Sequence, residues 1–358
     1  MPRKRMRKRM PDMELTANYP RLTVEETADR LVQLAQCTQH AVVLFHARPD
    51  GDAVGSAFAL RSLLSEMGMQ VRCLCANAVP ARLRFLTSDA EDAVEEETLP
   101  EAFRQKDVAV ISVDTASPAQ MGALAAQWQQ RVMLMIDHHE TGTLYAPALI
   151  DPKAAATGEL IYTLAQELMA RGCIRTLSLQ ACTALYAAIS SDTGSFRYSN
   201  VTGRTFEIAA ALRAQGVDTA QVSHALFESK PITQMTAEHL GFSVMQLWQD
   251  GRVAVIPFSY EMKVKNGLSD EDLETLVDMA RAIEGVEIVL SVRQPQAEER
   301  FRVSTRSSGA FCVAPLCARF GGGGHAKAAG CTVEAESMEA VLSLLKAALD
   351  AEQALQNV

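Results

Sequence analysis

The sequence predicts an α/β protein of two domains, an N-terminal domain with a parallel sheet flanked by helices and a smaller C-terminal α/β domain. Continuous apolar runs such as 41–45 alternate with segments of helical periodicity, and such runs are typical of strands buried on both faces of a parallel sheet. Near residue 252 the pattern changes to shorter strands and helices. The 358 residues are enough for two domain-sized cores. We expect a disordered basic tail over 1–20, a first domain over 21–230, a linker helix over 231–250 and a second domain over 251–358.

The composition excludes several classes of protein. The formal net charge is -9, and the first ten residues carry six basic side chains and no acidic one, so the body of the chain is acidic and offers no general surface for duplex nucleic acid. No apolar run reaches the roughly 18 to 20 residues of a membrane helix, and the N-terminus lacks the apolar core of a secretory signal. Eight scattered cysteines without a CxxC pair indicate buried free thiols. We therefore expect a cytoplasmic protein.

The basic stretch at residues 2–9 has one sign of charge and no apolar periodicity. It is either a solvated extension or start-site artefact, or an electrostatic tether for RNA. Salt-sensitive RNA binding that is lost on deleting residues 1–10 would identify a tether.

The first elements alternate as an α/β domain requires. Thr23 begins a helix that ends near Cys37, with Glu26 as its capping-box partner. The strand 41–45 follows, then an amphipathic helix that Gly68 ends, then a strand over 71–75. The acidic stretch 88–101 is predicted to be a loop with a solvated helix, and we assign it no function.

Two further strands end in polar residues. The run 108–113 leads into Asp114, and the run 132–136 leads into Asp137-His138-His139. The carboxyl ends of parallel strands meet at one edge of an open sheet, so these side chains are expected to share a site with those that follow the strand 41–45. Helices are then predicted over 157–172 and 177–190, and the second one leads into Asp192.

The remaining segments complete the first domain and form the second. Helices are predicted over 202–215, 219–227 and 233–247. After them we expect strands over 253–257, 286–292 and 301–305, a helix over about 270–283, a helix ending at 320, a strand from 331 and a terminal helix.

Eight side chains near these strand and helix ends are candidate metal ligands or their neighbours: His46, Asp50, Asp52, Asp114, Asp137, His138, His139 and Asp192. A single Asp at such a position is usually a cap or turn residue, but their conjunction favours a site for two divalent cations. A set rich in Asp with some His and no Cys suits Mn²⁺ or Mg²⁺ better than Zn²⁺. Two such ions promote phosphoester hydrolysis, and no GxxxxGK[ST] or GxSxG motif points to a different chemistry.

The glycine run 321–324 has two interpretations. It is either a flexible linker or, since His325 and Lys327 flank it, a loop whose amides approach an anion. Arg306 is likewise either a surface residue at a turn or a contact to a phosphate or carboxylate.

These motifs resemble the DHH phosphoesterase superfamily. Asp137-His138-His139 is similar to the motif that gives the family its name, the stretch from His46 to Ala53 to its first motif, Asp114-Thr115 to its second and 191–194 to its fourth, while 321–330 resembles the GGGGH segment of the DHHA1 domain. The compact two-domain form resembles the bifunctional oligoribonucleases and 3'-phosphoadenosine 5'-phosphate (pAp) phosphatases, also called nanoRNases. The basic tail is a departure from that group.

The resemblance implies roles for individual residues. One metal ion would be held by His46, Asp50 and Asp114, and the second by Asp52, Asp114, His138 and Asp192. His139 would act on the scissile phosphate, and Asp137 would orient the histidines. The nucleotide would be held from the opposite side of an interdomain cleft by Arg306, Ser307, Gly322, Gly323, Gly324 and His325.

The resemblance also implies an activity. We expect an enzyme, a phosphoric ester hydrolase that uses two divalent ions, Mn²⁺ first and Mg²⁺ or Co²⁺ as alternatives. Its substrates would be short single-stranded RNA, degraded to mononucleotides, and pAp. The alternatives are a phosphodiesterase for linear dinucleotides such as pGpG or pApA, and a non-catalytic nucleotide-binding regulator. A homodimer is implied by the resemblance alone.

Overall fold

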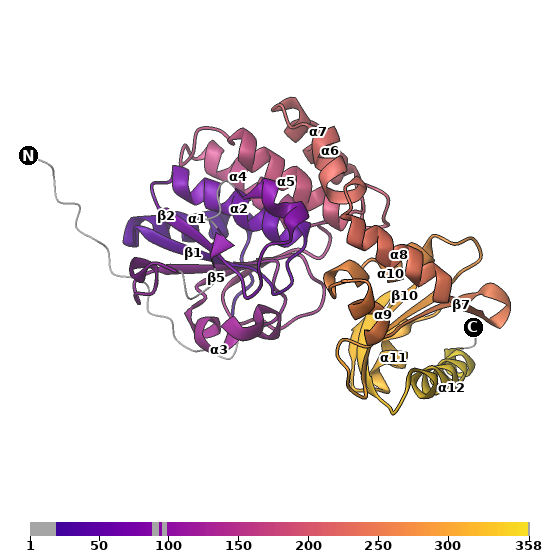
Figure 1. Cartoon of the computed structure of the whole chain (residues 1–358). Coiled ribbons are helices and arrows are strands. Elements are labelled where there is room, and N and C mark those ends of the chain that lie inside the picture. Colours follow the sequence, from indigo (N-terminus) through magenta and orange to yellow (C-terminus); the bar gives the residue numbers. More distant parts are fainter. Residues whose placement is uncertain (1–18, 88–92, 95–98, 357–358) are drawn as a thin grey trace, which may run out of the picture. The chain divides into compact units, whose positions relative to one another are not determined.

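The computed structural model describes residues 19–87, 93–94 and 99–356 (Figure 1). The chain divides into two compact units with the boundary between Ser229 and Lys230. The predicted tail, apart from its last two residues, and most of the acidic stretch 88–101 lie outside the described residues. All eight cysteines are free thiols, as predicted, but only five are buried, because Cys173, Cys312 and Cys331 are partly exposed. Among the described residues, no helix has the length and apolar character needed to cross a membrane.

The first unit is built on a six-stranded sheet in which every pairing is parallel. The strand order is β3-β2-β1-β4-β5-β6, so the chain starts in the middle and extends to both edges. Strands β1 and β4 are buried along nearly their whole length, and their sequences are apolar except for His40 in β1 and Ser112 in β4. The strands are β1 (His40–Leu44), β2 (Gln70–Leu74), β3 (Ala93–Val94), β4 (Ala109–Val113), β5 (Leu134–Asp137) and β6 (Ala148–Ile150).

Helices cover both faces of this sheet, which confirms the predicted fold class. One apolar core joins the sheet to α1, α2, α4 and α5, and a second core joins the opposite face to α3 (Figure 1). The helices are α1 (Val24–Cys37), α2 (Gly51–Glu66), α3 (Ala125–Trp128), α4 (Thr157–Ala170), α5 (Leu179–Asp192), α6 (Gly203–Ala214) and α7 (Thr219–Ser223), which continues as a π-helical turn (His224–Glu228). Thr23 and Glu26 form the predicted capping box of α1.

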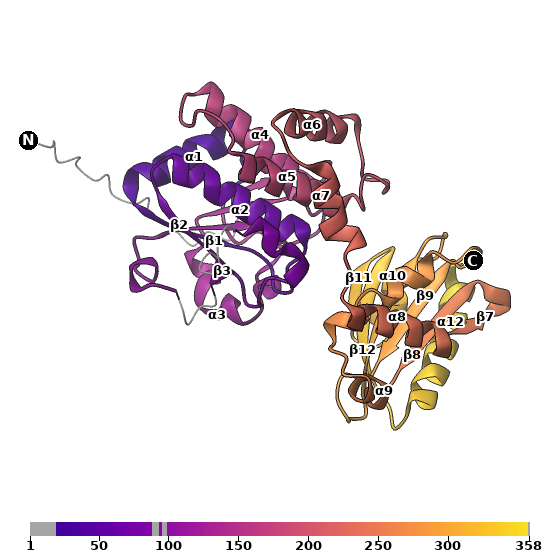
Figure 2. The same cartoon turned by 45° about the horizontal axis from the view of Figure 1, so that its top comes forward.

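Glycines let α2 approach α5 closely, and the two helices lie side by side in Figure 2. A Cβ atom on Gly55 would lie 2.3 Å from the carbonyl oxygen of Ala184. A Cβ atom on Gly158 of α4 would lie 2.7 Å from the Cβ of Ala188. This close packing brings the start of α2, the start of α4 and the end of α5 together.

The second unit has a six-stranded mixed sheet in the order β11-β12-β10-β9-β8-β7, in which only β8 and β9 pair in parallel. Helices α11 and α12 pack on one face, and α8 and α10 pack on the other (Figure 2). Its strands are β7 (Gln246–Trp248), β8 (Val253–Phe258), β9 (Ile288–Arg293), β10 (Arg300–Ser307), β11 (Gly323–His325) and β12 (Ala328–Glu334). Its helices are α8 (Ile232–Val244), α9 (Tyr260–Lys265), α10 (Leu276–Arg281), α11 (Val313–Ala318) and α12 (Met338–Gln356).

The prediction of one helix over about 270–283 is wrong in detail. The segment begins as a 3₁₀ turn over Glu271–Leu273, and only Leu276–Arg281 is α-helical. Within this turn, the carboxylate of Asp272 accepts hydrogen bonds from the amide and hydroxyl of Ser269 and from the hydroxyl of Thr233 on α8.

Candidate metal centre

The structure brings together the polar residues that follow β1, β4 and β5. The described residues include three groups whose ligand atoms lie within 4.8 Å of one another: His46 with Asp50 and Asp114, Asp52 with His138 and Asp192, and Asp114 with His138 and His139. Because Asp114 belongs to two of the groups and His138 also belongs to two, the three groups form one continuous site.

In the first group, the imidazole of His46 faces two carboxylates. Its Nε2 lies 3.6 Å from Asp50 Oδ1 and 3.5 Å from Asp114 Oδ2. Its Nδ1 lies 2.9 Å from the carbonyl oxygen of Ala47, so Nδ1 donates and Nε2 is the atom that can bind a metal. Asp50 is also the N-cap of α2 and accepts from the amides of Asp52 and Ala53.

The second group repeats this arrangement. Nε2 of His138 lies 3.1 Å from Asp192 Oδ2 and 3.8 Å from both Asp52 Oδ2 and Asp114 Oδ1. Its Nδ1 lies 3.2 Å from the carbonyl oxygen of Ala154. Both histidines therefore direct Nε2 toward carboxylates and Nδ1 toward the backbone.

Asp137 lies at the end of β5, is almost fully buried and accepts hydrogen bonds from the two residues that follow it. Its Oδ1 accepts from the amide of His138 at 2.9 Å and from Nδ1 of His139 at 2.7 Å. This second hydrogen bond is the largest of the effects that raise the pKa of His139. Asp137 thus contacts the imidazole ring of His139, whereas it contacts only the backbone amide of His138.

The N-terminus of α4 holds two of the site's carboxylates. Oδ2 of Asp52 accepts from the amide of Thr157 at 2.7 Å, and Oδ1 accepts from the amide of Gly158 at 3.0 Å and from the hydroxyl of Ser56 at 2.9 Å. The hydroxyl of Thr157 donates to Asp114 Oδ1 at 3.1 Å. Asp52 therefore satisfies the first amides of a helix that has no side-chain cap of its own. From the sequence, Thr157 is recognisable only as a helix start, because Asp52 and Asp114 both lie far from it in the chain.

Asp114 adopts a backbone conformation that L residues seldom use. Its φ is +49°, and its amide donates to the carbonyl oxygen of Ile136 at 3.0 Å. Asp tolerates this left-handed region better than most residues, but the conformation still carries strain that the surrounding structure must offset. The turn aims the Asp114 carboxylate between the two groups of ligands.

The electrostatics of the site favour a bound cation. Burial, with repulsion from Asp114 and Asp192, raises the pKa of Asp52 well above its usual range, and burial also raises the pKa of Asp192 to about 6. Burial alone would lower the pKa values of the two imidazoles, but the facing carboxylates raise that of His46 to about 11 and that of His138 to about 10. Positive charge nearby therefore stabilises these buried carboxylates. Divalent ions, which take oxygen and imidazole ligands, would supply such charge.

The predicted substrate-binding residues lie at one end of the second unit's sheet. Arg306 on β10 and His325 on β11 both pair with Ala328 on β12, one on each side of it. The Arg306 side chain is about one-third exposed, with Nε 3.4 Å from Asp278 Oδ1. Ser307 is buried, and its hydroxyl has no hydrogen-bond partner.

The glycine run forms the edge of this sheet rather than a linker. Gly322 packs so tightly on β12 that a Cβ atom there would lie 2.2 Å from the carbonyl oxygen of Gly330. Gly324 has a φ of +144°, and its Cβ would lie 2.5 Å from the carbonyl oxygen of Ala328. Gly323, between them, has open space around it. Two glycines are thus required by packing, and the third is exposed.

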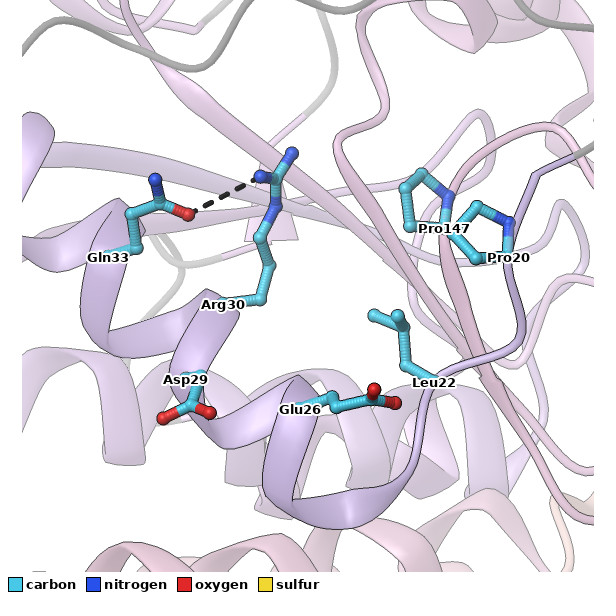
Figure 3. A pocket seen from close by; sticks show the side chains of 7 residues that line it. All are labelled: Pro20, Leu22, Glu26, Asp29, Arg30, Gln33 and Pro147. Atoms are coloured by element: carbon cyan, nitrogen blue, oxygen red, sulfur yellow. Dashed lines mark hydrogen bonds between the residues drawn. The ribbon is translucent and has the colours of Figure 1, made fainter.

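A pocket elsewhere in the first unit contains none of the predicted site residues. It has a volume of about 520 Å³ and lies between α1 and the segments that carry Pro20, Leu22 and Pro147 (Figure 3). Arg30 extends across it and donates to Gln33 at 3.4 Å. We assign this pocket no function.

The fold and the site define a class of protein, an α/β protein with an Asp- and His-rich candidate metal centre at the carboxyl ends of a parallel sheet. Its sequence matches the model of the DHH family, N-terminal domain, over residues 40–189 and that of the DHHA1 domain over residues 251–351. The chain belongs to the DHH family and carries a DHHA1 domain, which confirms the predicted family.

Several curated proteins are similar to most of the chain. The bifunctional oligoribonuclease and PAP phosphatase NrnA of Thermus thermophilus is 28% identical over 299 residues, which cover 81% of this chain and 82% of that protein. The protein of the same name from Bacillus subtilis is 28% identical over 80% of this chain and 87% of its own length. The cyclic-di-AMP phosphodiesterase GdpP of Geobacillus thermodenitrificans is 28% identical over 82% of this chain but only 45% of its own length.

A solved structure shares the fold. The crystal structure of an exopolyphosphatase-related protein from Bacteroides fragilis matches with a TM-score of 0.83 and 22% identity, over 92% of this chain and 97% of that chain.

Proposed function

We propose that the protein is a metal-dependent phosphoric ester hydrolase that degrades very short RNA to mononucleotides and removes a phosphate from pAp. The observation that carries this proposal is the position of Asp114, whose carboxylate lies between two groups of metal-ligand side chains. The relatives named as oligoribonucleases and PAP phosphatases, which match four-fifths of the chain, support this choice of substrates.

The proposed metal ligands are those that the resemblance implies. His46, Asp50 and Asp114 would hold one ion, and Asp52, Asp114, His138 and Asp192 would hold the other. We propose Mn²⁺, with Mg²⁺ or Co²⁺ as alternatives. When bound, two such ions lower the pKa of a water molecule and offset the charge of the phosphoryl group.

The other side chains bind and orient. His139, whose Nδ1 faces Asp137, would present its Nε2 to the phosphate or to the leaving oxygen and supply a proton there. In the second unit, Arg306, Ser307, Gly322, Gly323, Gly324 and His325 would bind the nucleotide. The unpartnered hydroxyl of Ser307 and the open backbone of Gly323 support this part of the proposal.

A substrate panel tests the proposal. Purified protein with Mn²⁺ is incubated with pAp, with the linear dinucleotides pGpG and pApA, and with short RNA of increasing length, and the products are separated by chromatography. We expect AMP from pAp and mononucleotides from the shortest RNA. Turnover of pGpG or pApA alone would favour the linear-dinucleotide phosphodiesterase, an alternative supported by the similarity to cyclic-di-AMP phosphodiesterases. Inactivity on all three would leave a nucleotide-binding regulator.

The substrate-binding role of His325 has its own test. His325→Ala is expected to raise the KM for pAp while metal content stays at the wild-type level. A change confined to metal content would contradict this role. A cytoplasmic location and a homodimer stay predictions.

A further inference from the structure

The loop that follows Asp192 is fixed closely to this candidate metal ligand. The amides of Arg197 and Tyr198 both donate to the carbonyl oxygen of Thr193, at 2.9 and 3.1 Å. The side-chain amide of Asn200 donates to the carbonyl oxygen of Asp192 at 3.1 Å. The position of the loop is therefore tied to that of the ligand.

The backbone of this loop is strained in a way that needs support. Gly194, Ser195 and Phe196 have φ angles of +54°, +60° and +61° in succession. For a bulky residue such as Phe196 this is a rare conformation that survives only where the surroundings enforce it. The Phe196 ring provides that enforcement, since it stacks on Phe206 with 5.7 Å between centroids and lies 5.8 Å from the ring of Tyr186.

This arrangement leaves the ring of Tyr198 and the side chain of Arg197 exposed in the loop that follows Asp192. Tyr198 is 44% exposed, and the hydroxyl end of its ring rests on Gly194, where a Cβ atom would lie 2.2 Å from Tyr198 Cζ. Nε of Arg197, an exposed residue, donates to the carbonyl oxygen of Gly194 at 2.6 Å, so the guanidinium and the Tyr198 ring both contact Gly194. An aromatic face beside a guanidinium matches a nucleotide, because the base stacks on the ring and the phosphate binds the cation.

We propose that Tyr198 and Arg197 form a nucleotide platform that stacks the base next to the scissile phosphate. The inference rests on the proposed function and adds a base-binding subsite to it. Stacking on an aromatic ring tolerates every base. The platform would therefore favour substrates that carry a base without selecting which base.

Binding of two small ligands tests the platform without requiring turnover. AMP and ribose 5-phosphate share the sugar and phosphate and differ in the base, and isothermal titration calorimetry on the Mn²⁺-loaded protein measures both. We expect the wild type to bind AMP more tightly. Tyr198→Leu should weaken AMP binding by about 10-fold or more, as loss of one stacked base predicts, and leave ribose 5-phosphate unchanged.

Two further variants separate a binding role from a structural one. Tyr198→Trp keeps an aromatic face and should retain the preference for AMP. Phe242→Leu, which removes an aromatic ring of similar exposure from α8, should have no effect on either ligand. The proposal is overturned if the wild type does not prefer AMP, or if Tyr198→Leu weakens both ligands equally, which would mean that the ring only supports the loop.

The outcome is distinguishable from failure of the proposed function. Absence of turnover on pAp and short RNA would refute the proposed hydrolase activity. The preference for AMP over ribose 5-phosphate, and its loss in Tyr198→Leu, would still test the platform because they measure binding alone. If turnover is present, Tyr198→Leu should raise the KM for a dinucleotide and leave the KM for its abasic counterpart unchanged.

Discussion

Replacing Thr157 with valine should weaken metal binding, although Thr157 is not itself a proposed metal ligand. Its hydroxyl donates to Asp114 Oδ1 at 3.1 Å, while its amide donates to Asp52 Oδ2 at 2.7 Å. Valine keeps the branched shape and the amide, so Thr157→Val removes only the hydrogen bond to Asp114.

The expected size of the effect follows from burial and charge. Thr157 is fully buried, and Asp114 is 2% exposed, so water does not replace the lost donor. A hydrogen bond to a charged group contributes about 1.5 to 3 kcal/mol, and loss of a residue that orients a metal ligand typically lowers metal affinity by about 10- to 100-fold. We expect Mn²⁺ affinity to fall within that range, measured by calorimetric titration of chelator-treated protein.

Two variants control for side effects. Thr157→Ser keeps the hydroxyl and should retain most of the affinity. Thr163→Val removes a hydroxyl from the same helix that donates to the carbonyl oxygen of Glu159 at 2.9 Å, so it should leave metal binding unchanged. Wild-type Mn²⁺ affinity in Thr157→Val would refute the reasoning.

Other predictions concern charge and packing. The raised pKa values of His46, about 11, and of His138, about 10, contribute stability that is fully present below the ordinary imidazole value of 6.5 and is lost as pH rises through 10 to 11. Denaturant titrations of the metal-free protein should therefore give a falling free energy of unfolding across that window, and Mn²⁺ binding near pH 7.5 should release protons, seen as a binding enthalpy that depends on the buffer. Gly55→Ala should destabilise the fold by about 1 to 3 kcal/mol, because its Cβ would lie 2.3 Å from the carbonyl oxygen of Ala184. Gly203→Ala, with open space around the Cβ, should be neutral or stabilising, and equal melting temperatures for the two glycine variants would contradict the packing argument.

Most of the first unit's fold could be predicted because its signals are local. A strand buried on both faces is a continuous apolar run, and a capping box such as Thr23 with Glu26 lies within four residues. The second unit was harder. In the 3₁₀ turn at Glu271–Leu273, the carboxylate of Asp272 accepts a hydrogen bond from Thr233, which is far away in the sequence, and nothing near the turn indicates that partner.

In the candidate site, too, some features could be predicted from the sequence and others depend on distant partners. That side chains at strand ends converge is a rule of parallel sheets, so Asp114 and His138 could be grouped from sequence. Their orientation could not, since it depends on a left-handed backbone at Asp114 and on the carbonyl oxygen of Ala154. The cap that Asp52 provides to α4 joins residues more than a hundred positions apart, and no local pattern indicates it.

His46 and His138 can offset the negative charge of the candidate site when no metal is bound. Without a cation, the facing carboxylates raise the pKa values of His46 and His138, so both imidazoles are protonated at neutral pH and offset the negative charge. To bind a divalent ion through Nε2, each ring would have to lose its Nε2 proton, whereas a guanidinium would stay charged and repel the ion. Asp52 is stabilised instead by hydrogen bonds from the amides at the start of α4, which need no titrating partner. We therefore expect the same fold to hold the carboxylates together with protons or with metal ions.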